Sequence, residues 1–103
     1  MNTTFYRERL RKIRARNEVS LAMRRDGSTL SAQPMRIEYA GARGFRLQSD
    51  AARAANQAVF ILGEHDMNIQ PEDRLTYDGH LIKVVFIQVN RLAGTIAEGV
   101  VEE

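Results

Sequence analysis

The most regular pattern of apolar and polar residues in this chain lies between residues 71 and 89. The sequence there contains "RLTY", then Asp78-Gly79, then "HLIKVVFIQV". Asp-Gly accepts the positive φ angles of a type I′ turn, so the pattern predicts a two-residue β-hairpin. The second strand is apolar on both faces except for Lys83 and Gln88, which predicts a central position in a sheet.

Shorter patterns predict the other strands. Residues 35–40, "MRIEYA", alternate between apolar and charged side chains, which predicts a half-buried strand. The run "AVFIL", residues 58–62, predicts a buried strand because it is short and rich in Val, Phe and Ile. A turn is predicted at residues 68–73, where Pro71 suits the second position.

The segment after the hairpin, "LAGTIAEGVVEE", predicts a final, weaker strand. Gly94 and Gly99 within it indicate bulges or a bend, as the corners of a small barrel require. A short return strand over residues 45–48, "FRLQ", completes the predicted set.

Residues 4–25 predict a helix that begins at the N-cap Thr4 and ends at Asp26-Gly27. Four apolar residues form a narrow stripe at helical spacing, which Asn17 interrupts: Tyr6, Leu10, Ile13 and Leu21. Most of the remaining surface is Arg. Because so narrow a stripe gains little from burial, we expect this helix to be frayed or disordered until a partner covers it. Residues 26–34 predict a linker.

Residues 41–58 predict a long, poorly anchored excursion. "GARG", residues 41–44, breaks the strand pattern, and the Ala-rich residues 49–58 contain almost no large apolar side chain. Two alternatives stay open for the Ala-rich part, a short helix capped by Ser49 or Asp50 and a mobile loop.

Together these elements predict a mostly β (α+β) protein of one domain, since the chain has 103 residues. Residues 31–103 form a small antiparallel β-barrel or sandwich in this prediction, because closure removes exposed edges. Residues 1–30 form a basic helix or flexible arm, and residues 41–58 form a mobile loop between strands.

The net charge of +2 hides an asymmetry along the chain. Residues 1–25 hold eight basic and two acidic residues, a net charge of +6, and the remainder holds seven basic and eleven acidic residues, a net charge of −4. A basic arm on an acidic body is typical of a protein that binds a negative surface or another copy of itself. We rank docking on an acidic protein surface first and nucleic-acid binding second, because the cations surround the predicted helix and aromatic residues are few. A solvated, partly disordered arm is the third alternative.

The sequence contains no motif for several kinds of catalytic or metal-binding site. The chain has no Cys, so it has no disulfide, thiol nucleophile or Cys-based zinc site. Glu64, His65 and Asp66 are adjacent, but neighbours in a strand point to opposite faces, which favours solvated residues over a metal site. Neither a nucleophile elbow nor a phosphate-binding loop is present. We therefore predict no catalytic residue, metal or cofactor, and no enzyme.

The N-terminal residues are charged and lack an apolar run of signal-peptide length, and no segment resembles a membrane span. These observations predict a protein that functions in the cytosol, or in a particle that is assembled there, without binding a membrane.

The cassette "VFILGEHDMNIQPEDRLTYDGHLIKVVFIQV", residues 59–89, resembles the C-terminal half of the small head–tail joining proteins of lambda-like tailed phages. These proteins are also called head-completion or head–tail attachment proteins. The shared pattern is an apolar strand at 59–62, polar residues, a turn at 70–72 and "D-x-L" at 73–75. A hairpin at Asp78-Gly79 then leads into a long apolar strand. The resemblance covers about a third of the chain and leaves residues 1–30 unmatched.

This resemblance implies a small β-barrel whose copies form a ring at the connector of a phage or prophage virion, between the DNA-filled head and the tail. It implies a free subunit that is a monomer or weak oligomer, with portal or head-side connector proteins and tail-end proteins as partners. Direct DNA contact would be secondary. The location would be the host bacterial cytoplasm during assembly and then the virion. Candidate partner-binding residues lie in the predicted arm and loop: Tyr6, Arg7, Leu10, Arg11, Ile13, Arg14, Gly41, Arg43, Gly44 and Arg46.

Two other functions stay open. A tail-terminator or tail-completion protein is also a small ring-forming α+β protein. A basic-armed nucleic-acid-binding module is the alternative from another class.

Overall fold

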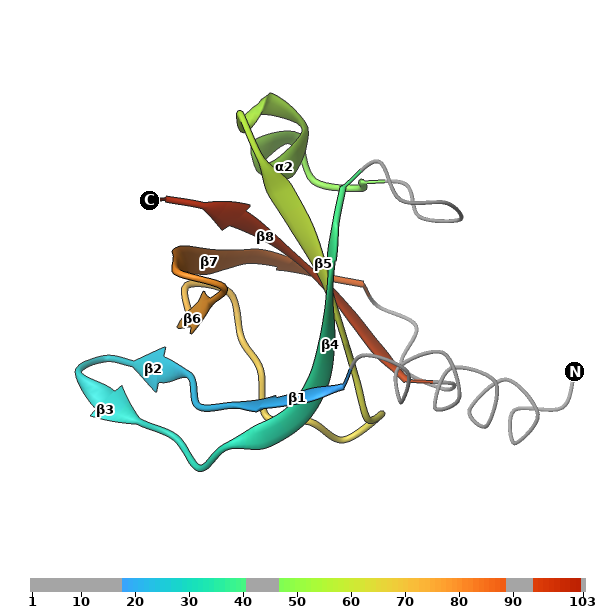
Figure 1. Cartoon of the computed structure of the whole chain (residues 1–103). Coiled ribbons are helices and arrows are strands. Elements are labelled where there is room, and N and C mark those ends of the chain that lie inside the picture. Colours follow the sequence, from blue (N-terminus) through green and yellow to red (C-terminus); the bar gives the residue numbers. More distant parts are fainter. Residues whose placement is uncertain (1–17, 41–46, 89–93, 103) are drawn as a thin grey trace, which may run out of the picture.

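A computed structural model describes residues 18–40, 47–88 and 94–102 (Figure 1). These residues are mostly β structure, as the sequence predicts. Their elements are β1 (Val19–Leu21), β2 (Arg24–Arg25), β3 (Ser28–Thr29), β4 (Gln33–Tyr39), α2 (Asp50–Ala54), β5 (Ala58–Gly63), β6 (Arg74–Tyr77), β7 (His80–Ile87) and β8 (Thr95–Val101).

The strands form one antiparallel sheet in the order β1-β4-β5-β8-β7-β6-β2-β3. β1 is at one end of this order and β2 is next to the other end, yet only Ala22 and Met23 separate them in the chain. The sheet is therefore strongly curled, as a half-barrel around a common interior (Figure 1). The predicted antiparallel β architecture is present in this coarser form.

The N-terminal part of the described chain corrects the prediction of a helix over residues 4–25. Residues 18–25 hold β1 and β2 instead, and residues 4–17 lie outside the described residues. Burial alternates along 19–25, with Val19, Leu21 and Met23 more buried than the residues between them. This period of two fits a strand whose inner side chains fill the curled sheet. Residues 18–30 of the predicted arm thus belong to the sheet.

Asp26-Gly27 forms a hairpin turn between β2 and β3 and is not a helix end. Its φ angles are +51° and +81°, as a type I′ turn requires. Arg25 pairs with Ser28 across the turn, and Arg24 pairs with Thr29. The predicted linker at 26–34 therefore contains this turn, β3 and the start of β4.

The hydrophobic core lies on the concave side of the sheet. All six residues of β5 are buried, which confirms the predicted buried strand. Met35 and Ile37 of β4 also lie in the core, while Arg36 and Glu38 form an ion pair on the opposite face. The main buried residues of the core are Met23, Met35, Ile37, Val59, Ile61, Met67, Ile69, Leu75, Ile82, Val84 and Ala97.

The predicted hairpin at Asp78-Gly79 is confirmed. The two residues have φ angles of +53° and +78°, and β6 pairs with β7 from Tyr77↔His80 to Arg74↔Lys83. The predicted turn before it is also present, since the Asp73 N–H donates to the Gln70 carbonyl oxygen at 3.2 Å.

The last strand, predicted to be weaker, occupies a central position between β5 and β7. The β7–β8 register shifts between Val84 and Phe86, opposite Gly99 and Glu98, which is a bulge of the kind that the glycines indicate. A Cβ at Gly99 would lie 2.7 Å from the Ile82 side chain, so this position requires close backbone approach.

Of the two alternatives for the Ala-rich segment, the structure has the short helix. α2 begins at the N-cap Ser49, whose hydroxyl accepts the Ala52 N–H at 3.0 Å. Residues 47 and 48 belong to no strand, so the predicted return strand over 45–48 is wrong there, and its other two residues lie outside the described chain.

Candidate interaction surface

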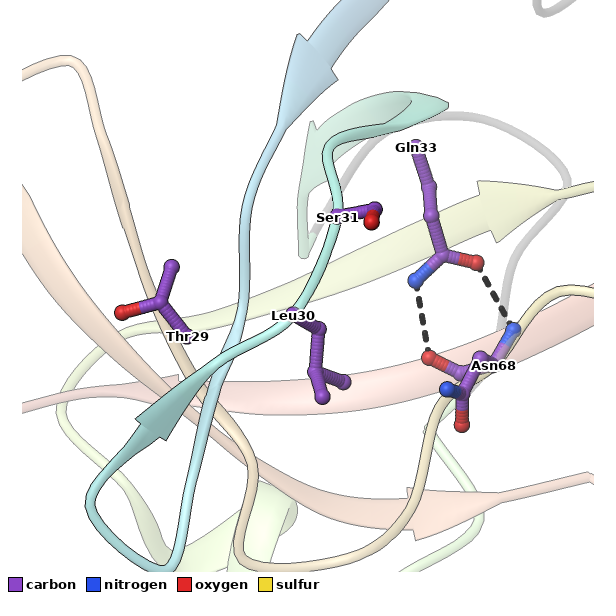
Figure 2. A pocket seen from close by; sticks show the side chains of 5 residues that line it. All are labelled: Thr29, Leu30, Ser31, Gln33 and Asn68. Atoms are coloured by element: carbon purple, nitrogen blue, oxygen red, sulfur yellow. Dashed lines mark hydrogen bonds between the residues drawn. The ribbon is translucent and has the colours of Figure 1, made fainter.

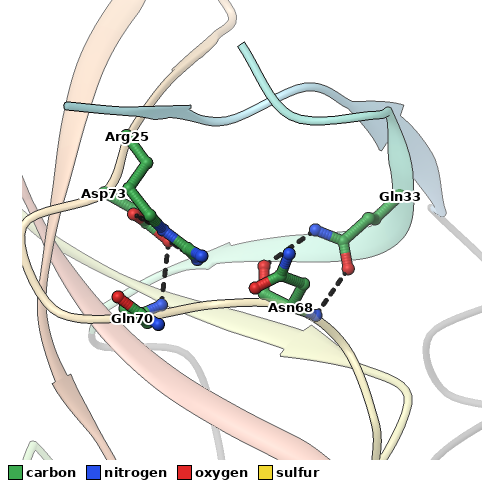
Figure 3. Close-up of polar contacts among 5 residues, drawn as sticks. All are labelled: Arg25, Gln33, Asn68, Gln70 and Asp73. Atoms are coloured by element: carbon green, nitrogen blue, oxygen red, sulfur yellow. Dashed lines mark hydrogen bonds and ion pairs between the residues drawn. The ribbon is translucent and has the colours of Figure 1, made fainter. Parts of the chain in front are cut away.

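A partly buried ion pair connects the β2–β3 hairpin to the segment before β6. Arg25 donates from Nε to Asp73 Oδ1 and from Nη2 to Asp73 Oδ2, both at 2.8 Å (Figure 3). Asp73 is 1% exposed, and its Oδ2 also accepts the Gln70 N–H at 2.8 Å. The hydrogen bonds from Arg25 to the carboxylate raise the pKa of Arg25, although burial of the guanidinium opposes this shift. The bidentate geometry fixes both partners.

A second polar contact lies beside the first. The Gln33 side chain donates from Nε2 to the Asn68 carbonyl oxygen at 2.9 Å and accepts the Asn68 N–H on Oε1 at 2.7 Å (Figure 3). The amide side chain therefore replaces a neighbouring strand and satisfies the donor and the acceptor of one backbone residue. Together, the two contacts hold residues 68–73 against Arg25 of the β2–β3 hairpin and against Gln33 at the start of β4.

A hollow is present where this hairpin meets the segment that includes Asn68. Leu30 and Ser31 lie on one side, and the paired Gln33 and Asn68 lie on the other (Figure 2). Its lining, completed by Thr29, contains hydroxyl, amide and aliphatic groups and no charged side chain. Such a lining can form hydrogen bonds, but it supplies no general acid, general base or nucleophile pair.

A second groove lies at the tip of the same hairpin and is strongly charged. It is lined by Arg24, Asp26, Gly27, Glu72, Arg74 and Leu81. Arg74 is directly opposite Arg24 in the β2–β6 pair, and its Nε donates to Glu102 Oε1 at 2.9 Å. This hydrogen bond and the charge of Glu102 raise the pKa of Arg74. Because both charge signs are mixed here, the groove does not favour a ligand of one sign.

Glu98 is a buried carboxylate that sequence patterns did not indicate. It is 0% exposed and accepts the Gln48 N–H at 2.7 Å and the Ser49 N–H at 3.0 Å. Both oxygens thus bind the backbone just before α2, which attaches the start of this short helix to the middle of the sheet. The role of Glu98 is therefore to anchor a connection, and it leaves no oxygen in the described contacts without a donor.

The partner-binding residues predicted from the sequence all lie in the ranges 1–17 and 41–46, outside the described residues. Glu64, His65 and Asp66 lie just after β5, and His65 and Asp66 are exposed. The part of the chain that the structure describes contains no group of three or more His, Asp or Glu residues that could hold a metal ion.

Sequence reasoning assigned no partner to the residues that make these polar contacts, namely Arg25, Gln33, Asp73 and Glu98. One signal was available for Arg25, because the alternation of Val19, Leu21 and Met23 continues to it. Gln33 and Glu98 have no such signal, since their partners are backbone groups 35 and about 50 residues away.

Comparisons with known proteins identify no relative: no family model, no curated protein and no solved structure matches this chain. Among the described residues, no helix has the length and apolar character that crossing a membrane requires.

Proposed function

We propose that this chain is a structural protein of a tailed phage or prophage virion and joins the DNA-filled head to the tail as one subunit of a ring at the connector. The observation that carries this proposal is the arrangement of residues 59–88, the described part of the segment that carries the resemblance. They contain all of β5 but its first residue, then the turn at 70–73 and the β6–β7 hairpin, in the same order as in the family that this segment resembles. All three strands belong to one curled antiparallel sheet.

The polar contacts of the described residues also favour a structural role. Asp73 and Glu98, the two most buried carboxylates, bind groups of the same chain and hold connections in place. A protein whose buried polar groups fix its shape is suited to present a rigid surface to other subunits.

The predicted basic segment supplies the second part of the proposal. Arg7, Arg11 and Arg14 would bind acidic surfaces of head-side proteins, and Tyr6, Leu10 and Ile13 would be covered in the same contact. Gly41, Arg43, Gly44 and Arg46 would contact a neighbouring ring. Ordering such segments on assembly lowers the affinity, which agrees with a free subunit that is a monomer or weak oligomer.

Electron microscopy of lysates from the parent phage, with this gene deleted, tests the function. Full heads and complete tails that lie unjoined are the expected result. Tails of irregular length would instead support a tail terminator. Normal infectious particles would contradict both virion functions, and duplex DNA binding that weakens steeply with salt would then support the nucleic-acid-binding alternative.

Charge reversal tests the role of the basic segment. We expect the triple variant Arg7→Glu, Arg11→Glu, Arg14→Glu to block joining in a complementation assay, because it replaces three cations by three anions. A matched control is Arg53→Glu in α2, whose side chain is 56% exposed. Circular dichroism should show an intact sheet in both variants. Normal joining by the triple variant would exclude this segment from the interface.

A further inference from the structure

Among the strands that the structure describes, β3 is at the end of the sheet order and pairs on one side only, with β2. The Leu30 N–H donates to the Met23 carbonyl oxygen at 2.8 Å, so the backbone groups of Leu30 face β2. Consecutive residues of a strand direct their backbone groups to opposite sides. The N–H and C=O of Thr29 therefore point away from β2, off the edge of the sheet.

Ser31 continues this edge. Within the described residues, its N–H and C=O have no hydrogen-bond partner. Thr29 and Ser31 are both exposed, and the hollow lined by Leu30, Gln33 and Asn68 lies beside them (Figure 2). The edge thus presents two residues with unused backbone donors and acceptors, next to open space.

The edge carries no charge. Residues 27–35, "GSTLSAQPM", form an uncharged stretch between Asp26 and Arg36. Natural sheets commonly place charged side chains on an edge to prevent pairing with another chain. Two copies of this edge can approach each other without charge repulsion between their own side chains.

We propose that the edge formed by residues 29–31 pairs with the same edge of a second copy, antiparallel and around a two-fold axis at Leu30. In this register Thr29 is opposite Ser31 of the second copy, and Ser31 is opposite its Thr29. Both residues direct backbone groups outward, so each such pair can form two N–H···O bonds. Leu30 then faces Leu30 of the second copy in a non-hydrogen-bonded pair, where side chains approach most closely.

This interface is isologous, since the same patch serves both copies. It does not rest on the proposed function, and it holds for any function of the chain. Because the paired edge is short, we expect a weak dimer, with a Kd on the order of 0.1 mM, near the weak end of specific association.

Cysteine cross-linking tests the register. The chain has no Cys, so a single introduced Cys can form a disulfide only with another copy. Cα atoms in a non-hydrogen-bonded antiparallel pair are about 4.5 Å apart, within the range of disulfides, so Leu30→Cys should cross-link readily under mild oxidation. Ser28→Cys is the matched control, two residues earlier in the chain. In the proposed register its two copies are about 13 Å apart, which is too far for a disulfide.

We expect Leu30→Cys to form covalent dimer at least about tenfold faster than Ser28→Cys, because pairing raises its effective concentration. Equal rates would show random collision and would overturn the proposal.

Sedimentation equilibrium provides a second readout that requires no cysteine. Wild-type protein should show a monomer–dimer equilibrium that Thr29→Pro abolishes, since proline removes an outward N–H without removing a bond inside the sheet. Thr29→Val keeps the N–H and should keep the dimer. The proposal would be overturned if the wild-type protein stayed monomeric at a protein concentration about ten times the expected Kd. So would oligomers larger than a dimer that Thr29→Pro abolishes, because they would indicate head-to-tail pairing of the edge.

Discussion

The two Asp-Gly turns of this chain have nearly the same backbone, but their flanking strands are held differently. The φ angles are +51° and +81° at Asp26-Gly27, and +53° and +78° at Asp78-Gly79. The second turn joins strands that pair with each other over four residues, whereas the first joins strands that pair over two. The first hairpin also depends on a contact 48 residues away, from Arg25 to Asp73. The turn sets the local geometry in both cases, but in the first hairpin tertiary contacts must hold the strands.

Removal of that distant contact should have the largest effect. Asp73→Ala deletes a fully buried acceptor that binds the Arg25 guanidinium and the Gln70 N–H. We expect the free energy of unfolding to fall by about 2–3 kcal/mol, since buried groups lose their partners. Urea denaturation provides the measurement.

Glu102→Gln is the control for this variant, because it weakens the more exposed ion pair to Arg74, whose effect should be near the limit of detection. If Asp73→Ala were as mild as the control, the first hairpin would not depend on the distant contact.

Alanine at the second turn position should have an intermediate and nearly equal effect in both hairpins. Gly27→Ala and Gly79→Ala each place a Cβ on a residue with positive φ, in open space. We expect the free energy of unfolding to fall by about 1 kcal/mol for each variant, from backbone strain alone. Thermal unfolding of the two variants measures the difference. If Gly79→Ala destabilised the protein several times more than Gly27→Ala, the second turn would also determine strand pairing.

The smallest effect should be a gain in stability. Glu72 has a φ of +78° in the turn before the second hairpin, an uncommon conformation for a residue with a Cβ. Glu72→Gly removes this strain but increases the entropy of the unfolded chain. We expect a net stabilisation of about 0.5 kcal/mol.

The Glu72 N–H donates to the Val84 carbonyl oxygen at 2.8 Å, and glycine keeps this bond. The shift in melting temperature checks the sign, and Glu72→Gln serves as the control that removes the charge but keeps the strain. Destabilisation by glycine, with no change for glutamine, would show that the side chain itself supports the turn.

Local sequence patterns predicted the β character, the hairpin at Asp78-Gly79, the buried strand at 58–62 and the turn around Pro71. Each depends on residues close together in the chain, so its signal is local. The helix over residues 4–25 was wrong at 18–25 because only Leu21 was assigned to the helical stripe, whereas Val19, Leu21 and Met23 together have the period of two of a strand.

The polar contacts between distant parts of the chain could not be predicted in the same way. Gln33 and Glu98 have their partners 35 to 50 residues away, and Arg25 lies 48 residues from Asp73, so only the curled sheet brings these groups together. For Glu98 the donors are backbone N–H groups, which no pattern of residue types can mark in a sequence. The residues predicted to bind partners lie outside the described chain, so their role stays a prediction.

The central position of β8 has a consequence for how the protein is made. The ribosome synthesises β8 after every other described strand, yet β5 and β7 both hydrogen-bond to it, over Ala58–Gly63 and Ile82–Ile87. Until residues 95–101 emerge, the two halves of the sheet have no strand between them and expose unpaired edges. The final sheet therefore forms only after β8 has been synthesised. A nascent chain truncated before β8 would expose two unpaired strand edges and would be prone to aggregate.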